Sequence, residues 1–556
     1  MTGLPSAAGV DRAAGDYRRS PMGNTSAPDL AVGSFTPSGP WLVEPGTMPW
    51  RVGIDELRAR AARSVPGLLA RRRLPPSVRV LRVGAELGWA LAGWAMVDRG
   101  RPTSRAGLSR RLRRSFEHLG PTYIKLGQII SSGEGLFPEE LVREFRLLRD
   151  RVPAEPFETV RRTIETDLGS SLSQLFVSFD PVPIASASIA QVYAATLRTG
   201  EHVVVKVQRS TVDRVVRQDI AAMSWIAPAL VGRIPVAALA NPPALVELFA
   251  ETIVEELDFR LEAENMLDVA AVLGTAAERS IVGRRPHPSL VTRRVLVMER
   301  MEGFAWGDVV GMQEAGIDTA AVLRAGLIGF LEGAFLHGVF HGDLHGGNLL
   351  VRRDGTVALL DFGITGRLGQ RRRRAFLQLM AGASSNDVRA QVAALRDLGA
   401  LPSDVDVDGV IHDLHLDLPP RDPTQMSAEE LTDELRTITK ALLGYGARLP
   451  KELMLSVKNM LFLNGAMATM APDVDILGEI LAVVTYFAEH HGDRIAEEIG
   501  MDLQSGPIDL DGYRAALGFT EPVEAITYRE LKERRELIAK RLANHRAQRH
   551  VRARTS

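Results

Sequence analysis

Apolar residues recur at helical spacing along most of the chain, and runs of β type first appear near residue 184. From residue 50 to residue 119 this spacing predicts helices, with residues 80–97 the most apolar. Gly120-Pro121 interrupts the pattern, and Pro121 suits the first turn of the next helix. Further helices are expected over residues 138–150, 157–168 and 323–337, over residues 244–273 as one long helix, and from residue 366 to residue 499 with a loop at residues 404–425.

Two β-hairpins are predicted within this helical background. Residues 184–193 and 202–207 flank a turn at Thr199-Gly200. The second hairpin joins residues 349–351 to residues 357–360 through a tight polar turn. Residues 291–298 add further strand, so the chain is predicted to combine many helices with a small amount of sheet.

The amino-acid composition rules out some kinds of site but does not identify a function. The 556 residues include 67 Lys and Arg against 68 Asp and Glu, so net charge names no partner, and the length suggests two or three globular units. No cysteine occurs, which excludes disulfides, thiolate metal sites and a cysteine nucleophile, and is compatible with a cytoplasmic location. Residues 1–50 are rich in Gly, Pro and Ser without a signal-peptide pattern, and we expect them to be disordered.

Three segments bear on membrane contact. Residues 221–240 are long and apolar, but two prolines and Arg233 argue against a transmembrane helix and favour a buried helix pair or a surface contact with a membrane. Residues 476–488 are too short to span a membrane and are expected to form a core helix. Residues 528–554 carry ten Lys or Arg against three Glu, which suits either a solvated helix or a contact with anionic lipid or nucleic acid.

Two short motifs carry the chemistry. A His-Gly-Asp tripeptide ends at Asp343 and is followed five positions later by Asn348, and an Asp-Phe-Gly tripeptide begins at Asp361. Phosphoryl transfer needs one group that orients a nucleophile, here Asp343, and oxygen ligands for magnesium, here Asn348 and Asp361. Either tripeptide alone is weak evidence, but together they predict a site for Mg²⁺ and ATP. His341 is then expected to be a structural support.

Lysine is rare in this chain, so the few positions that carry it are candidates for a function that needs an ammonium group. Seven of the 67 basic residues are Lys, and Lys125 and Lys206 stand in candidate motifs. Lys206 would contact the α- and β-phosphates, unless it is an ordinary surface lysine on an edge strand. Before it, where kinases carry a glycine loop over the phosphates, this chain has small residues whose side chains restrict positive φ. These nucleotide-binding candidates are Ala185, Ser186, Ala187 and Ser188.

Several acids on the predicted long helix compete as the partner of Lys206, and spacing alone does not separate them. Glu262 is our choice. Glu299 and Met301 follow the last predicted strand and are candidates for a hinge that contacts adenine. The competing acids are Glu255, Glu256, Asp258, Glu262 and Glu264.

Lys125 and Gln128 stand three positions apart on the helix that begins at Pro121, so they share one face. That face is either a polar recognition surface or a solvated helix face. Beyond Asp-Phe-Gly no Ala-Pro-Glu follows, the element with which protein kinases anchor a peptide-binding platform, and its absence weakens a protein-substrate interpretation.

Five motifs, in their order along the chain, resemble the UbiB/AarF family of atypical kinases over about residues 108–367. They are the Lys-x-Gly-Gln helix, the Ala/Ser loop, the Glu-Leu-Asp run, the HGDLHGGN loop and Asp-Phe-Gly. The resemblance implies an α+β, two-lobed protein-kinase-like fold with an N-terminal helical lid and a largely helical C-terminal lobe. It implies that Lys125 and Gln128 meet Glu256 and Asp258 over the active site, and that Glu262 pairs with Lys206. Asp343, Lys206 and Glu262 would then be the catalytic set.

Two departures from the family pattern lie in or near the lid. Gly133 and Gly135 stand where many members have Arg and Asp, and Ser186 interrupts the usual Ala triplet. Neither touches the metal or phosphate ligands, so nucleotide binding is expected to be retained. The domains expected are a disordered segment (1–50), the helical extension with the lid (51–170), an N-lobe (171–303), a C-lobe (304–500) and a basic tail (501–556).

The resemblance further implies an ATPase or a kinase of a small or lipidic acceptor, connected with isoprenoid-quinone or lipid metabolism. Three alternatives stay open: a protein kinase, a non-catalytic scaffold gated by nucleotide, and an antibiotic-type phosphotransferase. The expected partners are a small-molecule or lipid substrate and no specific nucleic acid. Peripheral membrane contact and oligomeric state are left open.

Overall fold

The computed structural model describes residues 48–70, 78–99, 104–131, 137–148, 153–230, 242–418, 430, 441, 444–447, 450–500, 526–534 and 536–538. The chain forms two compact units. The first holds residues 1–274, 282–302 and 358–365, and the second holds residues 275–281, 303–357 and 366–556. Asp361 therefore belongs to the same unit as Lys206, whereas Asp343 and Asn348 belong to the other.

An antiparallel sheet forms the core of the first unit, in the order β1 (Phe176–Phe179), β3 (Ala190–Leu197), β4 (His202–Gln208), β7 (Val295–Glu299) and β6 (Pro286–Val291). The short β2 (Ala185–Ser186) pairs with β3. Lys206 lies opposite Val192 on one side and Leu296 on the other. The lysine therefore stands on an interior strand, and the alternative of an edge-strand surface lysine is excluded.

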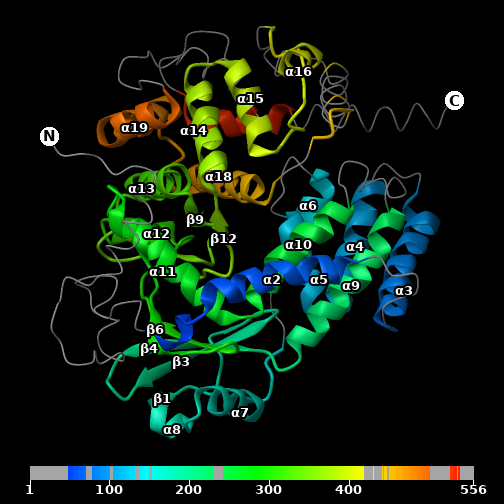
Figure 1. Cartoon of the computed structure of the whole chain (residues 1–556), viewed down its shortest axis with the longest axis vertical. Helices are drawn as coiled ribbons and strands as arrows, with labels where there is room; N and C mark the ends of the chain where they lie inside the picture. Colours follow the sequence, from blue (N-terminus) through cyan, green and yellow to red (C-terminus); the bar gives the residue numbers. More distant parts are fainter. Residues whose placement is uncertain are drawn as a thin grey trace. The chain divides into compact units, whose positions relative to one another are not determined.

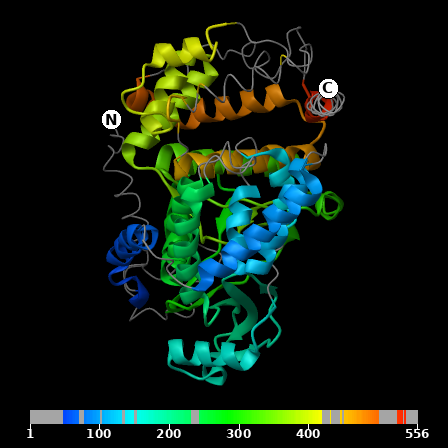
Figure 2. The ribbon, with the colours of Figure 1, turned by 90° about the vertical axis from the view of Figure 1, so that its right-hand side faces the viewer.

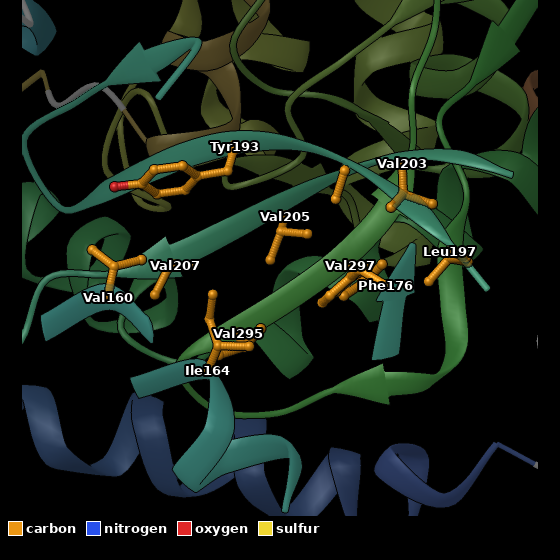
Figure 3. Packing of buried hydrophobic residues seen from close by; sticks show 11 residues of the cluster. Val160, Ile164, Phe176, Tyr193, Leu197, Val203, Val205, Val207, Val295 and Val297 are labelled. Atoms are coloured by element: carbon orange, nitrogen blue, oxygen red, sulfur yellow. The ribbon is translucent and has the colours of Figure 1, made fainter. Parts of the chain in front are cut away.

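One face of this sheet is apolar, because alternate residues of a strand point to the same side. Val203, Val205 and Val207 of β4 are each at most 1% exposed and pack with Tyr193 of β3. Ile164 of the helix α7 (Phe157–Leu168) packs into the same cluster (Figure 3). The alternation that buries these valines places Lys206 on the opposite face of β4.

The remaining helices of the first unit pack in a group with α3, α4 and α9 in contact, and α5 against α4 and α6 (Figures 1 and 2). Apart from α7 and the short α8 (Leu172–Leu175), they are η3 (Pro49–Arg51), α2 (Ile54–Leu69), α3 (Val78–Gly93), η4 (Trp94–Asp98), α4 (Ser104–Leu119), α5 (Pro121–Ser131), α6 (Glu139–Phe145), α9 (Val212–Leu230), α10 (Pro242–Glu256) and α11 (Phe259–Thr275).

The prediction of one long helix over residues 244–273 was wrong, because the helix breaks at Leu257-Asp258 and forms α10 and α11. The Asp258 side chain accepts the backbone N–H of Arg260 at 3.2 Å, and the Phe259 N–H donates to the Arg293 carbonyl at 3.0 Å. An aspartate that satisfies the first free N–H groups is a typical helix start. The new start turns the chain and gives α11 its own direction.

The second unit is largely helical, with short strands. Its helices are α12 (Val309–Glu314), α13 (Thr319–Leu331), η5 (Glu332–His337), α14 (Gln370–Ser384), α15 (Val388–Leu398), α16 (Val407–Asp413), α18 (Lys451–Met470) and α19 (Ile476–Ile499). Two further short sheets have the orders β5 (Ile281–Gly283), β11 (Val357–Leu359), β10 (Leu349–Val351), β8 (Phe304–Ala305), and β12 (Thr365–Arg367) with β9 (Val339–His341).

Two predictions for the second unit can be compared with these elements. The hairpin before Asp361 is present as β10 and β11. The loop predicted over residues 404–425 was wrong in part, because Asp406 caps the helix α16 by accepting the N–H of Asp408 at 3.1 Å.

Two helical segments of the described chain are long and apolar enough to cross a membrane, Val78–Asp98 and Thr319–His337. In their most apolar windows, 17% of the first and 72% of the second are buried. Core helices of soluble proteins have the same length and composition, so neither segment is assigned as a span. The expectations for residues 1–47, for Gly133 and Gly135, for residues 231–240 and for most of the basic tail lie outside the described residues.

Candidate active site

Lys206 and Glu262 form a buried ion pair in the first unit. The Lys206 Nζ lies 2.7 and 2.9 Å from the two carboxylate oxygens of Glu262, which α11 supplies, and 3.4 Å from Asp361 Oδ2. Lys206 is 7% and Glu262 3% exposed. The Lys206 ammonium also lies 5.4 Å from the ring centroid of Phe259. A strand and a helix far apart in sequence thus fix the position of this ammonium.

Acidic and basic groups surround this pair. Burial raises the pKa of Glu262 to about 7, although Lys206 opposes the shift. Burial also raises the pKa of Glu256, against Lys125, and Asp361 raises it further. For Lys206 burial alone would lower the pKa, but Asp361 and Glu262 outweigh it and the net shift is upward. Of the three carboxylates, Glu256 and Glu262 are buried and Asp361 is partly exposed, so Asp361 is the one that a ligand can reach.

Asp361 is held through both carboxylate oxygens and is still partly exposed. Its Oδ1 accepts the N–H of Gly363 at 2.8 Å, and its side chain is 45% exposed. The next residue, Phe362, is fully buried and its carbonyl accepts Asn265 Nδ2 at 2.9 Å. A buried Phe therefore holds the backbone while the carboxylate before it stays accessible to a ligand.

The lid helix α5 reaches this cluster through Lys125. The Lys125 Nζ lies 3.1 Å from Glu256 Oε1 at the end of α10. Glu256 in turn lies beside Asp-Phe-Gly, because a Cβ added to Gly363 would be 3.6 Å from Glu256 Cγ. Asp258 instead pairs with Arg260 at 2.7 Å. Of the two acids expected at the lid, the structure places Glu256 on Lys125.

Gln128 and Gly127 complete the lid motif. Gln128 is half-buried, and its carbonyl accepts the Ser131 hydroxyl at 2.8 Å. At Gly127 an added Cβ would lie 2.2 Å from Leu148 Cδ1 and 3.3 Å from Phe116. This glycine is therefore required for close packing of α5 against its neighbours rather than for contact with phosphate.

The Ala/Ser loop is held in place by an arginine that no sequence pattern had selected. Arg209 Nη2 donates to Ser186 Oγ at 2.9 Å, its Nε donates to the Ala187 carbonyl at 3.0 Å, and its Nη1 donates to the Pro153 carbonyl at 2.9 Å. Ala185 lies in β2, and Ser188 is 2% exposed. The loop is held by side-chain hydrogen bonds in place of the glycine flexibility of a typical phosphate loop.

The hinge candidates lie at the end of the first unit. Both carboxylate oxygens of Glu299 pair with Arg285, at 2.6 and 2.8 Å, and the Glu299 N–H donates to the Arg285 carbonyl at 2.9 Å. Met301 is half-buried two residues later. Nearby, burial lowers the pKa of Arg284 to about 10, and its Nε has no hydrogen-bond partner among the described residues.

In the second unit, the catalytic loop is centred on Asp343. His341 Nδ1 accepts the Asp343 N–H at 3.1 Å, and Asn348 Nδ2 donates to the Asp343 carbonyl at 2.9 Å. Because the Asn348 amide nitrogen is used in this way, its oxygen is the atom left to bind a metal ion. His341, 5% exposed, thus supports the loop as the sequence predicted.

A helix more than 100 residues later holds this loop, and this contact was missed by the sequence analysis. Lys458 of α18 forms a short ion pair with Asp343 Oδ1. The adjacent Asn459, fully buried, accepts the Leu344 N–H at 3.0 Å and donates to the His341 carbonyl at 2.5 Å. The signal available in the sequence was the rarity of lysine, which marks Lys458 as it marks Lys206.

Magnesium would need more than protein ligands here. Within the described residues no three His, Asp or Glu side chains come together as a metal site. Mg²⁺ is commonly held by one or two protein oxygens together with water and substrate phosphates. The partly exposed Asp361 carboxylate fits that manner of binding.

Two features define a protein of the kinase-like class. One is a strand lysine held by a helix glutamate beside Asp-Phe-Gly, and the other is a His-Gly-Asp loop followed by an asparagine. The model of the ABC1 atypical kinase-like domain matches residues 147–395. An uncharacterized protein of Mycobacterium tuberculosis is 36% identical over 410 residues, covering 72% of this chain and 83% of its own length.

Two further relatives carry the family name. A probable protein kinase UbiB of Xylella fastidiosa is 33% identical over 377 residues, covering 66% of this chain and 67% of its own. A chloroplastic aarF domain-containing protein kinase of Arabidopsis thaliana is 31% identical over 400 residues, covering 66% and 72%. The chain belongs to the ABC1/UbiB (AarF) family of atypical kinases, and the predicted α+β kinase-like fold class is confirmed.

Proposed function

We propose that this protein binds Mg-ATP and either hydrolyses it or transfers its terminal phosphate to a small or lipidic acceptor. The observation that carries the proposal is the cluster of Lys206, Glu262 and Asp361, in which a fixed ammonium lies 3.4 Å from a partly exposed carboxylate. A bound magnesium ion would supply positive charge to the phosphate oxygens.

Lys206 would bind the phosphates, and Glu262 would hold the ammonium in place. Because the transition state of phosphoryl transfer spreads negative charge over the phosphate oxygens, a fixed cation favours it over the ground state. Asp361 and Asn348 would be the protein ligands of magnesium. The proposal requires one nucleotide to use both sets of residues, so Lys206→Met and Asn348→Ala should each weaken Mg-ATP binding.

Asp343 would accept the proton of the attacking hydroxyl or water. Its carboxylate is paired with Lys458 through Oδ1, and its Oδ2 lies 3.8 Å from His345 Nε2. Lys458 would hold Asp343 in orientation and balance its charge. Protein kinases place such groups close together in the catalytic loop, whereas here the lysine comes from α18.

The Lys125–Glu256 pair favours a small or lipidic acceptor over a protein. It places α5 beside Asp-Phe-Gly, so access for a folded protein substrate would require the lid to move. A role in isoprenoid-quinone or lipid metabolism, with a cytoplasmic location and peripheral membrane association, agrees with this acceptor class. No feature of the described residues favours a nucleic-acid partner.

The test is ATP hydrolysis by the purified full chain, with and without anionic liposomes and quinone-precursor mimics. Asp361→Asn keeps the shape of the side chain but removes its charge, so turnover should fall by at least about a hundredfold. Asp473→Asn, an exposed aspartate paired with Arg529, is the matched control and should behave as wild type. Unchanged hydrolysis by Asp361→Asn would remove the mechanism.

The same assay separates the alternatives. A nucleotide-gated scaffold would bind Mg-ATP without turnover under every lipid condition. An ordinary protein kinase would transfer phosphate to a protein while Lys125 is intact. An antibiotic-type phosphotransferase would show acceptor-dependent turnover that Gln128→Ala does not change. Lys125→Ala leaves Asp361 in place, so it measures the contribution of the lid separately from that of the metal ligand.

A further inference from the structure

Arg284 is a half-buried arginine of the first unit, and the proposed chemistry makes no use of it. It stands between β5 and β6, and its backbone N–H donates to the Leu359 carbonyl at 3.1 Å. The preceding Gly283 lies against Asp-Phe-Gly, because an added Cβ would be 3.4 Å from Phe362 Cζ. The backbone at Arg284 is therefore held beside the segment that carries Asp361.

Strand alternation shows on which face of the sheet the Arg284 side chain lies. Val295 and Val297 of β7 belong to the apolar cluster (Figure 3). Because successive residues of a strand point to opposite faces, Met298 points away from that cluster, to the same face as Lys206. Arg284 Nη1 lies 3.8 Å from Met298 Sδ. The Arg284 guanidinium therefore lies on the face of the sheet that carries Lys206.

The Arg284 guanidinium has no ionic partner among the described residues. Its contact with the Met298 sulfur is to a weak acceptor. Its Nε is enclosed by the protein and donates to no acceptor in the described part of the chain. Its Nη2 likewise has no acceptor there, but this nitrogen is not enclosed. Nη2 is therefore the donor that a ligand can reach.

The acids around Arg284 do not compensate for its missing partner. Burial lowers the pKa of Arg284 to about 10, although Asp361, Glu299 and Glu262 oppose the shift. The oxygens of these three carboxylates already accept from other donors, namely Arg285, Lys206 and the Gly363 N–H. A buried donor without an acceptor destabilises the protein, and an acceptor on a ligand would remove that cost.

The neighbours of Arg284 indicate which part of a nucleotide it would meet. Met298 directly precedes Glu299, and Glu299 and Met301 are the hinge candidates expected beside the base. The phosphates are expected instead at Lys206. A guanidinium only donates hydrogen bonds, so on a base it can bind only acceptor atoms. Guanine has two neighbouring acceptors, O6 and N7, whereas adenine has N7 beside an amino group that is itself a donor.

We propose that Arg284 is a specificity-determining residue of the nucleotide site, that its guanidinium donates to the O6 and N7 edge of the base, and that the site therefore binds GTP at least as tightly as ATP. This inference rests on the proposed function, because it requires a nucleotide on the Lys206 face of the sheet. Arg284 takes no part in the phosphate chemistry. Its effect is on the choice of purine.

The test is calorimetric titration of the purified full chain with ATP, GTP and inorganic tripolyphosphate, each with Mg²⁺. Wild type should bind GTP at least as tightly as ATP. Arg284→Met should weaken GTP binding by about tenfold or more and ATP binding by less than about threefold, since guanine loses the acceptor pair that a guanidinium matches. Tripolyphosphate binding should not change. Arg353→Met, at an exposed arginine in the turn between β10 and β11, is the control and should bind all three ligands as wild type does.

The three ligands separate the possible outcomes. Equal losses for all three would make Arg284 a phosphate-binding or structural residue and overturn the proposal. GTP binding that Arg284→Met leaves unchanged, or a wild type that binds GTP more weakly than ATP, also overturns it. Arg284→Lys keeps the charge without the planar fork, so it serves if the Met variant fails to fold and should still lose affinity for GTP more than for ATP. A wild type that binds none of the three ligands would instead contradict the proposed function.

Discussion

Each unit contains a lysine–carboxylate pair, and the two pairs differ in how deeply their side chains are buried. Lys206 is 7% exposed, with Glu262 and Asp361 both in reach. The Lys458 and Asp343 side chains are 17% and 18% exposed, and Asp343 Oδ2 also lies 3.8 Å from His345 Nε2. The first joins a strand to a helix inside a core, whereas the second joins a loop to a helix near the surface.

The difference follows from solvation. A buried charge whose partner is removed has neither water nor an opposite charge to stabilise it, whereas a partly exposed charge is rehydrated. The Lys206 pair should therefore contribute to stability and to nucleotide binding together. The Lys458 pair should affect the orientation of Asp343 with little effect on stability. Three predictions measure this contrast.

The largest effect is expected for Lys206→Met. Removing the ammonium leaves buried carboxylates without a cation, and the free energy of unfolding should fall by about 3–5 kcal/mol. Urea unfolding of the full chain measures the change. The double variant Lys206→Met with Glu262→Met removes both charges and should recover part of the loss. A loss of unfolding free energy below about 1 kcal/mol would show that the Lys206 pair behaves like a surface pair, for which such a loss is typical.

The next effect is a pH dependence of stability from Glu262. Its pKa of about 7 in the folded chain lies above the ordinary value of a glutamate, about 4.5, so the folded state keeps this proton where the unfolded state loses it. Its contribution is therefore full below about pH 4.5 and is lost as the pH rises to about 7, on the order of 3 kcal/mol at most.

Glu262→Gln provides the control for this pH effect, because the amide has no proton to lose in this range. The free energy of unfolding of wild type minus that of Glu262→Gln should decrease from pH 4.5 to pH 7. A difference that stays constant or increases over this range would show that Glu262 is ionised in the folded chain at low pH.

The smallest effect on stability is expected for Lys458→Met, within about 1 kcal/mol of wild type because the pair is partly exposed. Turnover should nevertheless fall by about a hundredfold or more, since Asp343 loses the partner that orients it. KM for ATP should change little, and Lys458→Arg should recover part of kcat. A variant that loses several kcal/mol of stability with normal kcat per folded molecule would make Lys458 a structural residue instead.

Much of the first unit could be predicted from sequence. The strand at residues 202–207 and its hairpin with the preceding strand followed from turn residues and β-type runs, whereas the structure decided that Lys206 stands on an interior strand. Family membership followed from motifs that are contiguous in the chain. Glu262 was chosen among five acids before the structure placed it on Lys206, but its role in catalysis remains a prediction.

Contacts made by residues distant in sequence were the ones missed. Lys458 and Asn459 lie 115 positions or more from the catalytic-loop atoms they contact, and no local pattern links a helix to a loop at that distance. Arg209 appeared to be one arginine among many until the fold placed it on the Ala/Ser loop. The break between α10 and α11 was missed because Asp258 interrupts the helix without a Gly or Pro.

The sequence by itself determined most of the elements and the family, because these depend on residues that are neighbours in the chain. Only the tertiary structure decided which surfaces are covered. Val78–Asp98 and Thr319–His337 have similar length and hydropathy, yet 17% of one window and 72% of the other are buried. Hydropathy measures how strongly a segment prefers to leave water, whereas burial depends on whether another element of the fold covers it.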